Sequence, residues 1–394
     1  FVNNSATSDG GGMNSIVCNA LLRNVYFEDN HSRELGGGLM NNRGAANMIG
    51  VTFIDNTAEW GGGVYNLLDN TYVVNAFFGN NVADVAGGGM YNDESPASVM
   101  NAIFSGNRTL DPALRGGGGM GNFRETPFLA NNVFFGNTTA RDGGAIFNIN
   151  SDPRIVNSIL WGNQAGGLED EIFSGGFPGA SALVIASIVQ GGVPQSSVDG
   201  GGNFDTDPFF VDPNGEDDVI GTTDDNFHLT LASPAIEAGF NGLLLFDVLD
   251  LDEDGDIGEG VPIDFDGNQR VFNGLGGLFA VDLGVYEFGA PAIVTVVGTE
   301  TDTAELPVVP VFVDAYPNPF RNQATLRYAL PTDGRVILKV YDTLGREIAT
   351  LVDQYLPAGT HEARFSAPDL ANGLYLYHLD VGGRTATKKL MLIR

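Results

Sequence analysis

Short apolar bursts, broken by glycine and asparagine, recur at a nearly constant interval through the first half of the chain. Glycine triplets, the sixth ending in alanine, start 25 or 26 residues apart except for one step of 30, at Gly10, Gly36, Gly61, Gly87, Gly117 and Gly143. An asparagine lies three positions beyond the end of five triplets: Asn41, Asn66, Asn92, Asn122 and Asn148. Between triplets, an aromatic or aliphatic residue stands three positions before another asparagine, in Phe27/Asn30, Phe53/Asn56, Phe78/Asn81, Phe104/Asn107, Phe134/Asn137 and Leu160/Asn163. The chain therefore repeats one unit of about 26 residues.

A unit this short cannot bury its apolar residues alone, so successive units must stack on one another. Helical units are excluded because three consecutive glycines cost roughly 1 kcal/mol each in a helix interior and interrupt any apolar stripe. Parallel strands instead place equivalent residues of successive units about 4.8 Å apart, phenylalanine on phenylalanine and asparagine on asparagine. The crossover rule favours a right-handed winding. Residues 1–203 are therefore predicted to form a right-handed parallel β-helix, and because Phe1 and Asn4 fit the repeat frame, we expect the chain to start inside a repeat.

The pattern changes after the repeats. Residues 204–289 hold short apolar segments between turns and are predicted to be an acidic segment that caps the β-helix. Residues 290–313 are rich in proline, threonine and valine without a repeat, and are predicted to be a linker. From 314 to 394, apolar and polar residues alternate with period two between glycine-containing turns, which predicts an immunoglobulin-like β-sandwich. The whole chain is thus expected to be all-β.

Composition narrows the classes of function. The 394 residues carry 49 acidic and 19 basic side chains, a net charge of −30, which excludes nucleic acid as a partner because phosphates need lysine and arginine. The charge concentrates in residues 201–290, where 20 acids accompany a single base, Arg270. The one cysteine, Cys18, cannot form an internal disulfide. No apolar run approaches the ~18–20 residues of a membrane-spanning helix, so no transmembrane segment is expected.

Three parts of the chain resemble known families. The glycine triplets and Phe-x-x-Asn signals of residues 1–163 resemble the repeats of the polymorphic outer-membrane proteins, a family of β-helical surface adhesins. The succession of Asp207-Pro208, Ser233-Pro234, 264–270 and 282–288 resembles the choice-of-anchor domain that ends many secreted bacterial β-helices. These resemblances imply the β-helix fold and an extracellular location.

The last segment resembles the C-terminal sorting domain of type IX secretion. The motifs that carry the resemblance are Tyr316-Pro317-Asn318-Pro319, Val340-Tyr341-Asp342 and Asn372-Gly373-Leu374-Tyr375. The resemblance implies that the type IX secretion machinery is a partner. It also implies export through the periplasm of a Gram-negative bacterium, and a secreted or cell-surface protein.

The acidic segment contains the best candidate metal site. Asp250, Asp252, Asp254 and Asp256 place carboxylates at alternate positions with Gly255 sixth, as in the first half of an EF-hand loop. The twelfth position is Val261 instead of glutamate, so a complete EF-hand fails and a hard-cation site of another shape is predicted. Ca²⁺ is the expected cofactor, with further ligands in the same segment at Asp217, Asp224, Asp264 and Asp266. A solvated acidic loop is the alternative.

Large side chains also recur after the glycine triplets, at Tyr65, Tyr91 and Phe147. By strand alternation they face the side opposite Val64 and Met90. If that side is outward, they form a row that stacks on sugar rings or on a partner surface, and if it is inward, they belong to the core. We therefore expect a non-enzymatic, adhesin-like protein that binds a polysaccharide or a cell surface.

Two other classes of function stay open. One is a polysaccharide lyase or hydrolase on the same scaffold, and the other is a structural stalk. A lyase needs a basic residue that takes a proton from the substrate, for which the candidates are Arg108, Arg115, Arg124, Arg141 and Arg154. The four histidines show no zinc-like spacing, and no catalytic residue is predicted.

Overall fold

The chain divides into two compact units, Phe1–Thr295 and Val296–Arg394. The computed structural model describes residues 1–290 except 45, 113–114, 168, 177–178, 252–258 and 273–279. In the second unit it describes 311–316, 320, 323–330, 334–342, 346–357, 359–367, 370, 373–381 and 384–392.

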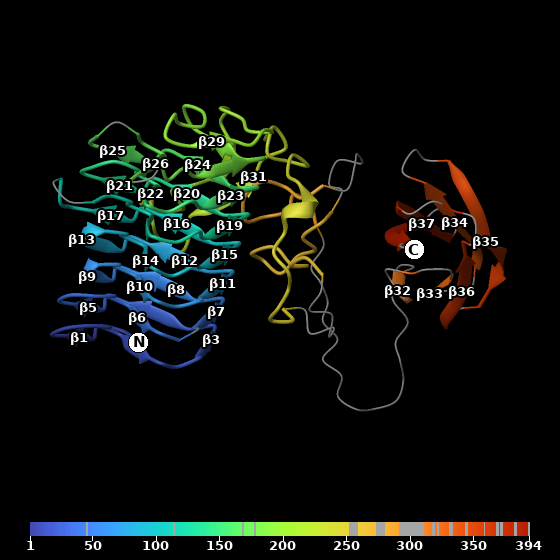
Figure 1. Ribbon diagram of the computed structural model, residues 1–394, viewed down its shortest axis with the longest axis horizontal. Helices are drawn as coiled ribbons and strands as arrows, with labels where there is room; N and C mark the ends of the chain where they lie inside the picture. The colour runs from blue at the N-terminus through green and yellow to red at the C-terminus, as the bar shows by residue number, and fades with distance from the viewer. Residues whose placement is uncertain are drawn as a thin grey trace. The chain divides into compact units, whose positions relative to one another are not determined.

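The first unit is a parallel β-solenoid, in which seven coils of four short strands stack on one another (Figure 1). Equivalent strands of successive coils pair in parallel and build four sheets, here named I to IV. Sheet I follows the glycine triplets and consists of β2 (Met13–Ile16), β6 (Leu39–Asn42), β10 (Val64–Leu67), β14 (Met90–Asp93), β18 (Met120–Phe123), β22 (Ile146–Ile149) and β26 (Ile172–Gly175). Sheet II consists of β3 (Leu21–Arg23), β7 (Asn47–Ile49), β11 (Tyr72–Val74), β15 (Ser98–Met100), β19 (Phe128–Ala130), β23 (Arg154–Val156), β27 (Leu183–Ile185) and β29 (Val198–Asp199).

The other two sheets complete each coil. Sheet III consists of β4 (Tyr26–Glu28), β8 (Thr52–Ile54), β12 (Phe77–Gly79), β16 (Ile103–Ser105), β20 (Val133–Phe135), β24 (Ile159–Trp161) and β28 (Ile188–Val189). Sheet IV consists of β1 (Ser5–Ala6), β5 (His31–Ser32), β9 (Thr57–Trp60), β13 (Val82–Ala86), β17 (Arg108–Thr109), β21 (Thr138–Thr139) and β25 (Gln164–Ala165). The parallel β-helix that the repeat predicts is confirmed.

The repeated phenylalanines form one continuous stack through the solenoid core. Rings of successive coils, from Phe1 to Phe134, lie nearly parallel with their centroids 4.5–5.0 Å apart. The stack fills the interior together with apolar residues of sheets I and II, such as Met90 and Val99, which are fully buried. Because the ring spacing matches the spacing of paired strands, each coil contributes one phenylalanine to the stack.

Two ladders of buried asparagines accompany the phenylalanine stack. In the first, from Asn4 to Asn163, each side-chain Nδ2 donates to Oδ1 of the next coil's asparagine over 2.8–2.9 Å. The same Nδ2 donates to a phenylalanine carbonyl one coil back, as Asn81 does to Phe53. The second ladder runs from Asn41 to Asn148 in sheet I. These bonds satisfy amide groups that would be costly to bury unpaired.

The glycine triplets allow the backbone to turn and to pass close to the phenylalanine rings. In the fourth coil, Gly87 has φ +64°, a conformation that side chains disfavour. A Cβ on the third glycine, Gly89, would lie 2.9 Å from the Phe104 Cδ1 atom of the same coil. The sixth and seventh coils obey the same constraint with other residues. Where the phenylalanine is replaced by Leu160, the third glycine becomes Ala145, and where it is replaced by Val189, that position holds Glu171.

Glu171 ends the first asparagine ladder. Its carboxylate accepts hydrogen bonds from the Asn163 side chain (Oε2, 2.6 Å) and backbone (Oε1, 3.4 Å), and the residue is 4% exposed. Burial raises the pKa of Glu171 to about 8, although the Asn163 hydrogen bonds oppose the shift. The last full coil thus carries a carboxyl group that is more easily buried when it is protonated.

The acidic segment runs along the side of the solenoid, where Figure 1 draws it in yellow and orange. Its described elements are β30 (Phe210–Asp212), paired antiparallel with β31 (Asn226–Leu229), and a 3-10 turn, η1 (Asn241–Leu243). Phe227 and Val285 pack on the outer residues of sheet III, such as Ile103, while Leu251 and Val261 pack on those of sheet II, such as Met100. A cap was expected from the sequence, but these residues cover the flank of the solenoid, because its outer faces on sheets II and III are apolar.

The second unit consists of two antiparallel sheets around a common core, a β-sandwich-like arrangement that agrees with the prediction. One sheet has the order β32 (Val311–Tyr316), β33 (Gln323–Leu330), β36 (Gly359–Ser366). The other has the order β35 (Glu347–Leu356), β34 (Gly334–Asp342), β37 (Gly373–Val381), β38 (Arg384–Leu392). Leu326 from the first sheet and Leu338 from the second lie in the same buried cluster. Strand β32 begins inside the predicted linker, of which residues 291–310 lie outside the described residues.

We expect the substitution Gly119→Ala to destabilise the solenoid by about 1–3 kcal/mol, because the new Cβ would lie 2.8 Å from the Ala145 carbonyl oxygen and 2.9 Å from the Phe134 ring. In a Phe134→Leu background the same substitution should cost less than half as much, since the native Ala145/Leu160 pair has this arrangement in the next coil. The measurement is a double-mutant cycle by chemical denaturation. Equal costs in both backgrounds would show that the ring does not select the glycine.

We expect Glu171→Gln to stabilise the solenoid at pH 8 but not at pH 5. The raised pKa of Glu171 means that its contribution to stability is full below pH 4.5 and is lost as pH rises toward 8. Glutamine stays neutral and offers Asn163 the same acceptor, so the difference from wild type at pH 8 should reach at least about 2 kcal/mol, given about 1.4 kcal/mol per pKa unit. Denaturant melts of both proteins at the two pH values check it, and a pH-independent difference would contradict it.

Candidate functional site

The outer face of sheet I carries a second, smaller apolar cluster outside the solenoid core. Strand alternation turns Tyr65 and Tyr91 away from Val64 and Met90, which belong to the core. The two tyrosine rings stack across neighbouring coils with their centroids 5.4 Å apart. They are nevertheless only 6% and 1% exposed, so this outward row is covered by other side chains.

Three half-buried side chains cover the tyrosines. Trp60, at the end of β9, meets the Tyr91 ring edge to face at 5.2 Å. Arg115 lies over the Trp60 ring at 5.3 Å and over the Phe123 ring at 4.3 Å, and its Nη1 donates a hydrogen bond to the Tyr91 hydroxyl. We call Trp60, Tyr65, Tyr91, Arg115 and Phe123 the aromatic–arginine cluster.

Acidic groups border this cluster. The Tyr65 hydroxyl donates to Asp93 Oδ2 over 2.8 Å, and Glu94 forms an exposed ion pair with Arg124 at 3.0 Å. Burial, and then the neighbouring Asp93 carboxylate, raise the pKa of Tyr65, and burial raises that of Tyr91. Both phenols therefore stay protonated, and the Tyr65 hydroxyl donates to Asp93 while the Tyr91 hydroxyl accepts from Arg115. The surface combines aromatic walls, a guanidinium and carboxylates, which is the chemistry that binds sugar rings and their hydroxyl groups.

Phe147, the third predicted ligand-binding residue, lies apart from the cluster. Between it and Tyr91 the outward row has Gly121, whose Cβ would lie 2.7 Å from the Tyr91 ring. Phe147 is 3% exposed and stacks on Phe173 at 5.2 Å. All three predicted residues thus face outward, which is one of the two orientations that the sequence left open. They are nevertheless buried, and Gly121 interrupts the row between Tyr91 and Phe147.

The sequence pattern missed Trp60 and Phe123 and assigned Arg115 only to a possible lyase. Trp60 ends a strand of sheet IV and Phe123 belongs to a different outward row of sheet I. The available signal was the single step of 30 residues between glycine triplets, since the extra residues between β17 and Gly116 carry Arg115.

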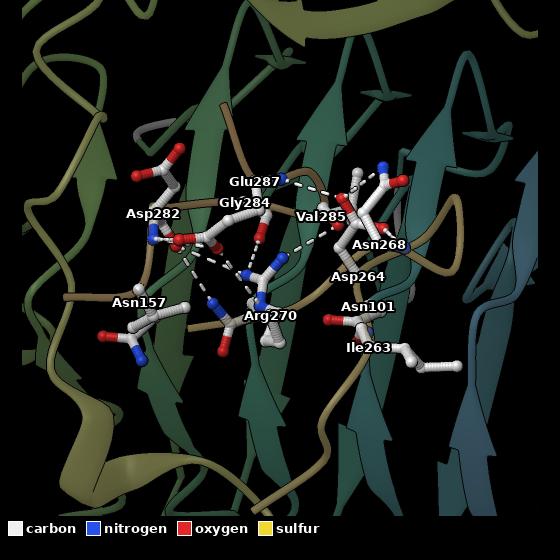
Figure 2. Close-up of polar contacts among 12 residues, drawn as sticks. Asn101, Asn157, Ile263, Asp264, Asn268, Arg270, Asp282, Gly284, Val285 and Glu287 are labelled. Atoms are coloured by element: carbon white, nitrogen blue, oxygen red, sulfur yellow. Dashed lines mark hydrogen bonds and ion pairs between the residues drawn. The ribbon is translucent and has the colours of Figure 1, made fainter. Parts of the chain in front are cut away.

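The acidic segment is anchored by Arg270, its only basic residue (Figure 2). The side chain is fully buried and donates to the backbone carbonyls of Val285 (2.9 Å), Asp282 (3.3 Å) and Gly284. Its Nε atom lies 3.9 Å from Glu287 Oε2. Both Glu287 oxygens accept the Asp282 backbone N–H over 3.2 Å. One guanidinium therefore holds the end of the segment together.

Burial shifts the pKa values of the carboxyl groups around Arg270. Burial raises the pKa of Glu287 to about 9, more than the Arg270 charge lowers it, and burial also raises that of Asp282 to about 6. Burial lowers the pKa of Arg270 as well, but a guanidinium starts so high that it stays charged at neutral pH. The network is therefore most stable on the acid side of neutrality, where these carboxyl groups bind protons.

A third row of asparagines, which the sequence analysis did not single out, attaches this segment to the solenoid. These asparagines occupy the left-handed turn between sheets II and III, for example Asn101 with φ 50°. Asn101 Nδ2 donates to the Ile263 carbonyl over 2.8 Å, and Asn157 both donates to and accepts from the Phe240 backbone. Figure 2 shows Asn101 and Asn157 among the contacts of the segment. Their spacing of 26 or 30 residues, at Asn75, Asn101, Asn131 and Asn157, was the signal in the sequence.

The predicted calcium ligands fall into separate places. Asp264 is buried in a turn, where its oxygens accept from backbone N–H groups of Asp266, Asn268 and Glu287. Asp266 pairs with His228 Nε2 at 2.8 Å. Asp217 and Asp224 share the Thr222 hydroxyl in an exposed loop.

The other predicted calcium ligands are Asp250, Asp252, Asp254 and Asp256. Asp250 has φ 50°, and Asp252, Asp254 and Asp256 lie outside the described residues. Within the described part of the chain, no group of three or more His, Cys, Asp or Glu side chains is placed to hold a metal ion. Calcium binding therefore stays a prediction.

Comparison with protein-family models finds two matches. Residues 314–393 match the secretion system C-terminal sorting domain. Residues 50–67 and 133–149 match the Chlamydia polymorphic membrane protein repeat. No curated protein and no solved structure matches the chain.

The sorting domain decides the location. The chain is a β-solenoid protein that is secreted or displayed at the surface of a Gram-negative bacterium, and its tail interacts with the type IX secretion machinery. Among the residues placed in the structure, no helix is long and apolar enough to cross a membrane. The predicted resemblances to both families are confirmed.

We expect Arg270→Met to destabilise the acidic segment by about 3–5 kcal/mol, because the change leaves buried carbonyl groups and Glu287 without their cation. The measurement is limited proteolysis, with new cleavage expected within residues 204–290 while the solenoid persists. The matched control is Arg335→Gln, which breaks the exposed pair with Asp353 and should cost less than about 1 kcal/mol. Unchanged protease resistance of Arg270→Met would contradict the assignment.

Proposed function

We propose that this exported β-solenoid is a non-enzymatic binding protein that attaches to carbohydrate through the aromatic–arginine cluster on the outer face of sheet I. The single observation that carries the proposal is the arrangement of Trp60, Arg115 and Phe123. These half-buried side chains hold a guanidinium against two aromatic rings, next to Tyr65 and Tyr91 of the same cluster. Sugar rings bind to such surfaces through their C–H faces on aromatic rings and their hydroxyl groups on charged side chains.

The rest of the solenoid supports this position of the site. The acidic segment covers much of the outer faces of sheets II and III, as the packing of Val285 and Val261 shows. The interior is filled by the phenylalanine stack. On the outer face of sheet I, by contrast, the described residues of the apolar cluster around Tyr65 and Tyr91 include none from the acidic segment.

A glycan array probed with the purified protein tests the proposal, followed by affinity measurements on the glycans retained. We expect Trp60→Ala to weaken binding at least tenfold, about 1.4 kcal/mol, because the substitution removes one aromatic wall. The matched control is Trp161→Ala, a half-buried tryptophan on sheet III, which should leave affinity unchanged.

Three outcomes would contradict the proposal. They are binding to no glycan, equal losses in both tryptophan variants, and cleavage of the glycan with new chain ends. The last would favour the polysaccharide lyase or hydrolase instead, because unsaturated ends mark lyase chemistry and new reducing ends mark hydrolysis. Melting temperatures of both variants separate lost binding from lost folding.

A further inference from the structure

Arg115 differs from the other arginines of the solenoid in its surroundings. Among the described arginines of residues 1–200, only Arg115 and Arg141 are half-buried, and Arg141 pairs with Asp142 at 3.3 Å. The ion pairs within the described ranges include no carboxylate partner for Arg115. In a chain with 49 acidic residues, a half-buried cation without a carboxylate is unexpected.

The contacts of Arg115 leave most of its donors unused. A guanidinium has five N–H groups in a planar fork, and among the described residues Arg115 donates one side-chain hydrogen bond, from Nη1 to the Tyr91 hydroxyl. Its remaining contacts are with the Trp60 and Phe123 rings, which stabilise the charge but accept no hydrogen bond in the plane of the fork. The N–H edge is thus available to a planar anion such as a carboxylate, or to a sulfate.

The position of Arg115 depends on a local extension of one coil. The fourth step between glycine triplets has 30 residues, against 25 or 26 for the others, and the extension follows β17. Arg115, which directly precedes the glycines, lies over the Phe123 ring at 4.3 Å, and Arg124 approaches the same ring at 4.6 Å. Arg124 is paired with Glu94, so Arg115 is the cation of this surface that lacks a carboxylate.

We propose that the aromatic–arginine cluster selects anionic glycans, with Arg115 binding the carboxylate or sulfate of a sugar residue whose ring contacts Trp60 or Phe123. This inference rests on the proposed function, because it names the ligand class of the same surface. A net charge of −30 repels polyanions from the molecule as a whole. A preference for the charged glycan therefore comes from a short-range contact, and not from the general field of the protein.

The test compares two pairs of probes that differ in charge: polygalacturonate with its methyl ester, and dextran sulfate with dextran. We expect the charged member of at least one pair to bind at least tenfold more tightly at 0.15 M salt. Which pair responds distinguishes carboxylate from sulfate recognition. Polyglutamate, an anion without sugar rings, should bind at least tenfold more weakly than the charged glycan.

Variants then assign the effect to Arg115. Arg115→Gln should reduce binding of the charged glycan to the level of its neutral partner, and Arg115→Lys should retain an intermediate affinity, since the charge remains without the planar fork. The matched control is Arg154→Gln, which removes an exposed arginine 5.5 Å from the Phe128 ring on sheet II and should change nothing. Melting temperatures confirm that each variant is folded.

Each contrary outcome has a distinct meaning. Equal or tighter binding of the neutral probes overturns the anionic selectivity but leaves carbohydrate binding standing. Polyglutamate binding as tightly as the charged glycan overturns it in favour of an acidic protein partner. Retained charge preference in a folded Arg115→Gln variant overturns the role of Arg115, and absence of binding to every glycan, on the array and here, overturns the proposed function as well.

Discussion

The stacking of one phenylalanine per coil on the phenylalanine of the next is the interaction on which the first unit depends. The centroid spacing of 4.5–5.0 Å equals the separation of paired strands, so ring stacking and backbone pairing are satisfied by the same geometry. At the third triplet glycines Gly12, Gly38, Gly89 and Gly119 the ring also lies within 2.9 Å of where a Cβ would stand. When the stack tapers to Leu160 and then Val189, that position becomes Ala145 and then Glu171. A smaller core residue thus accompanies a larger residue at the third triplet position of the same coil.

The interior repeats from coil to coil, whereas the outer faces of the sheets differ in the residues that they carry. Sheets II and III carry apolar outer residues, and the acidic segment covers them, held by asparagine side chains of the turns and by the buried Arg270. Sheet I carries tyrosines that pack under Trp60, Arg115 and Phe123. A repeated scaffold therefore presents a covered flank and an aromatic surface, and the aromatic surface combines rings with the half-buried Arg115.

Charge distribution separates these two surfaces. In the acidic segment, burial of Glu287 and Asp282 beside one guanidinium raises the pKa of both carboxyl groups, which favours the folded segment on the acid side of neutrality. At the aromatic–arginine cluster, Arg115 is stabilised by rings instead of carboxylates. The first arrangement is structural, because it joins parts of one chain. In the second, the described residues take up one side-chain hydrogen bond of the guanidinium, which is why we propose an external anion there.

The sequence by itself determined the solenoid, its phenylalanine and asparagine ladders, the antiparallel tail and the sorting domain. It placed Tyr65 and Tyr91 on the strand face opposite Val64 and Met90 without deciding whether that face is outward. These features repeat at a fixed interval or alternate with period two, so a local pattern specifies them. Only the tertiary structure decided that both tyrosines are covered, that Arg115 reaches Phe123, and that the described residues of the acidic segment follow the flank. Those outcomes depend on contacts such as Asn101 with Ile263, across 162 residues of chain. The repeat spacing marks Asn101, but nothing periodic marks Ile263, whose position depends on how the acidic segment packs on the stacked coils.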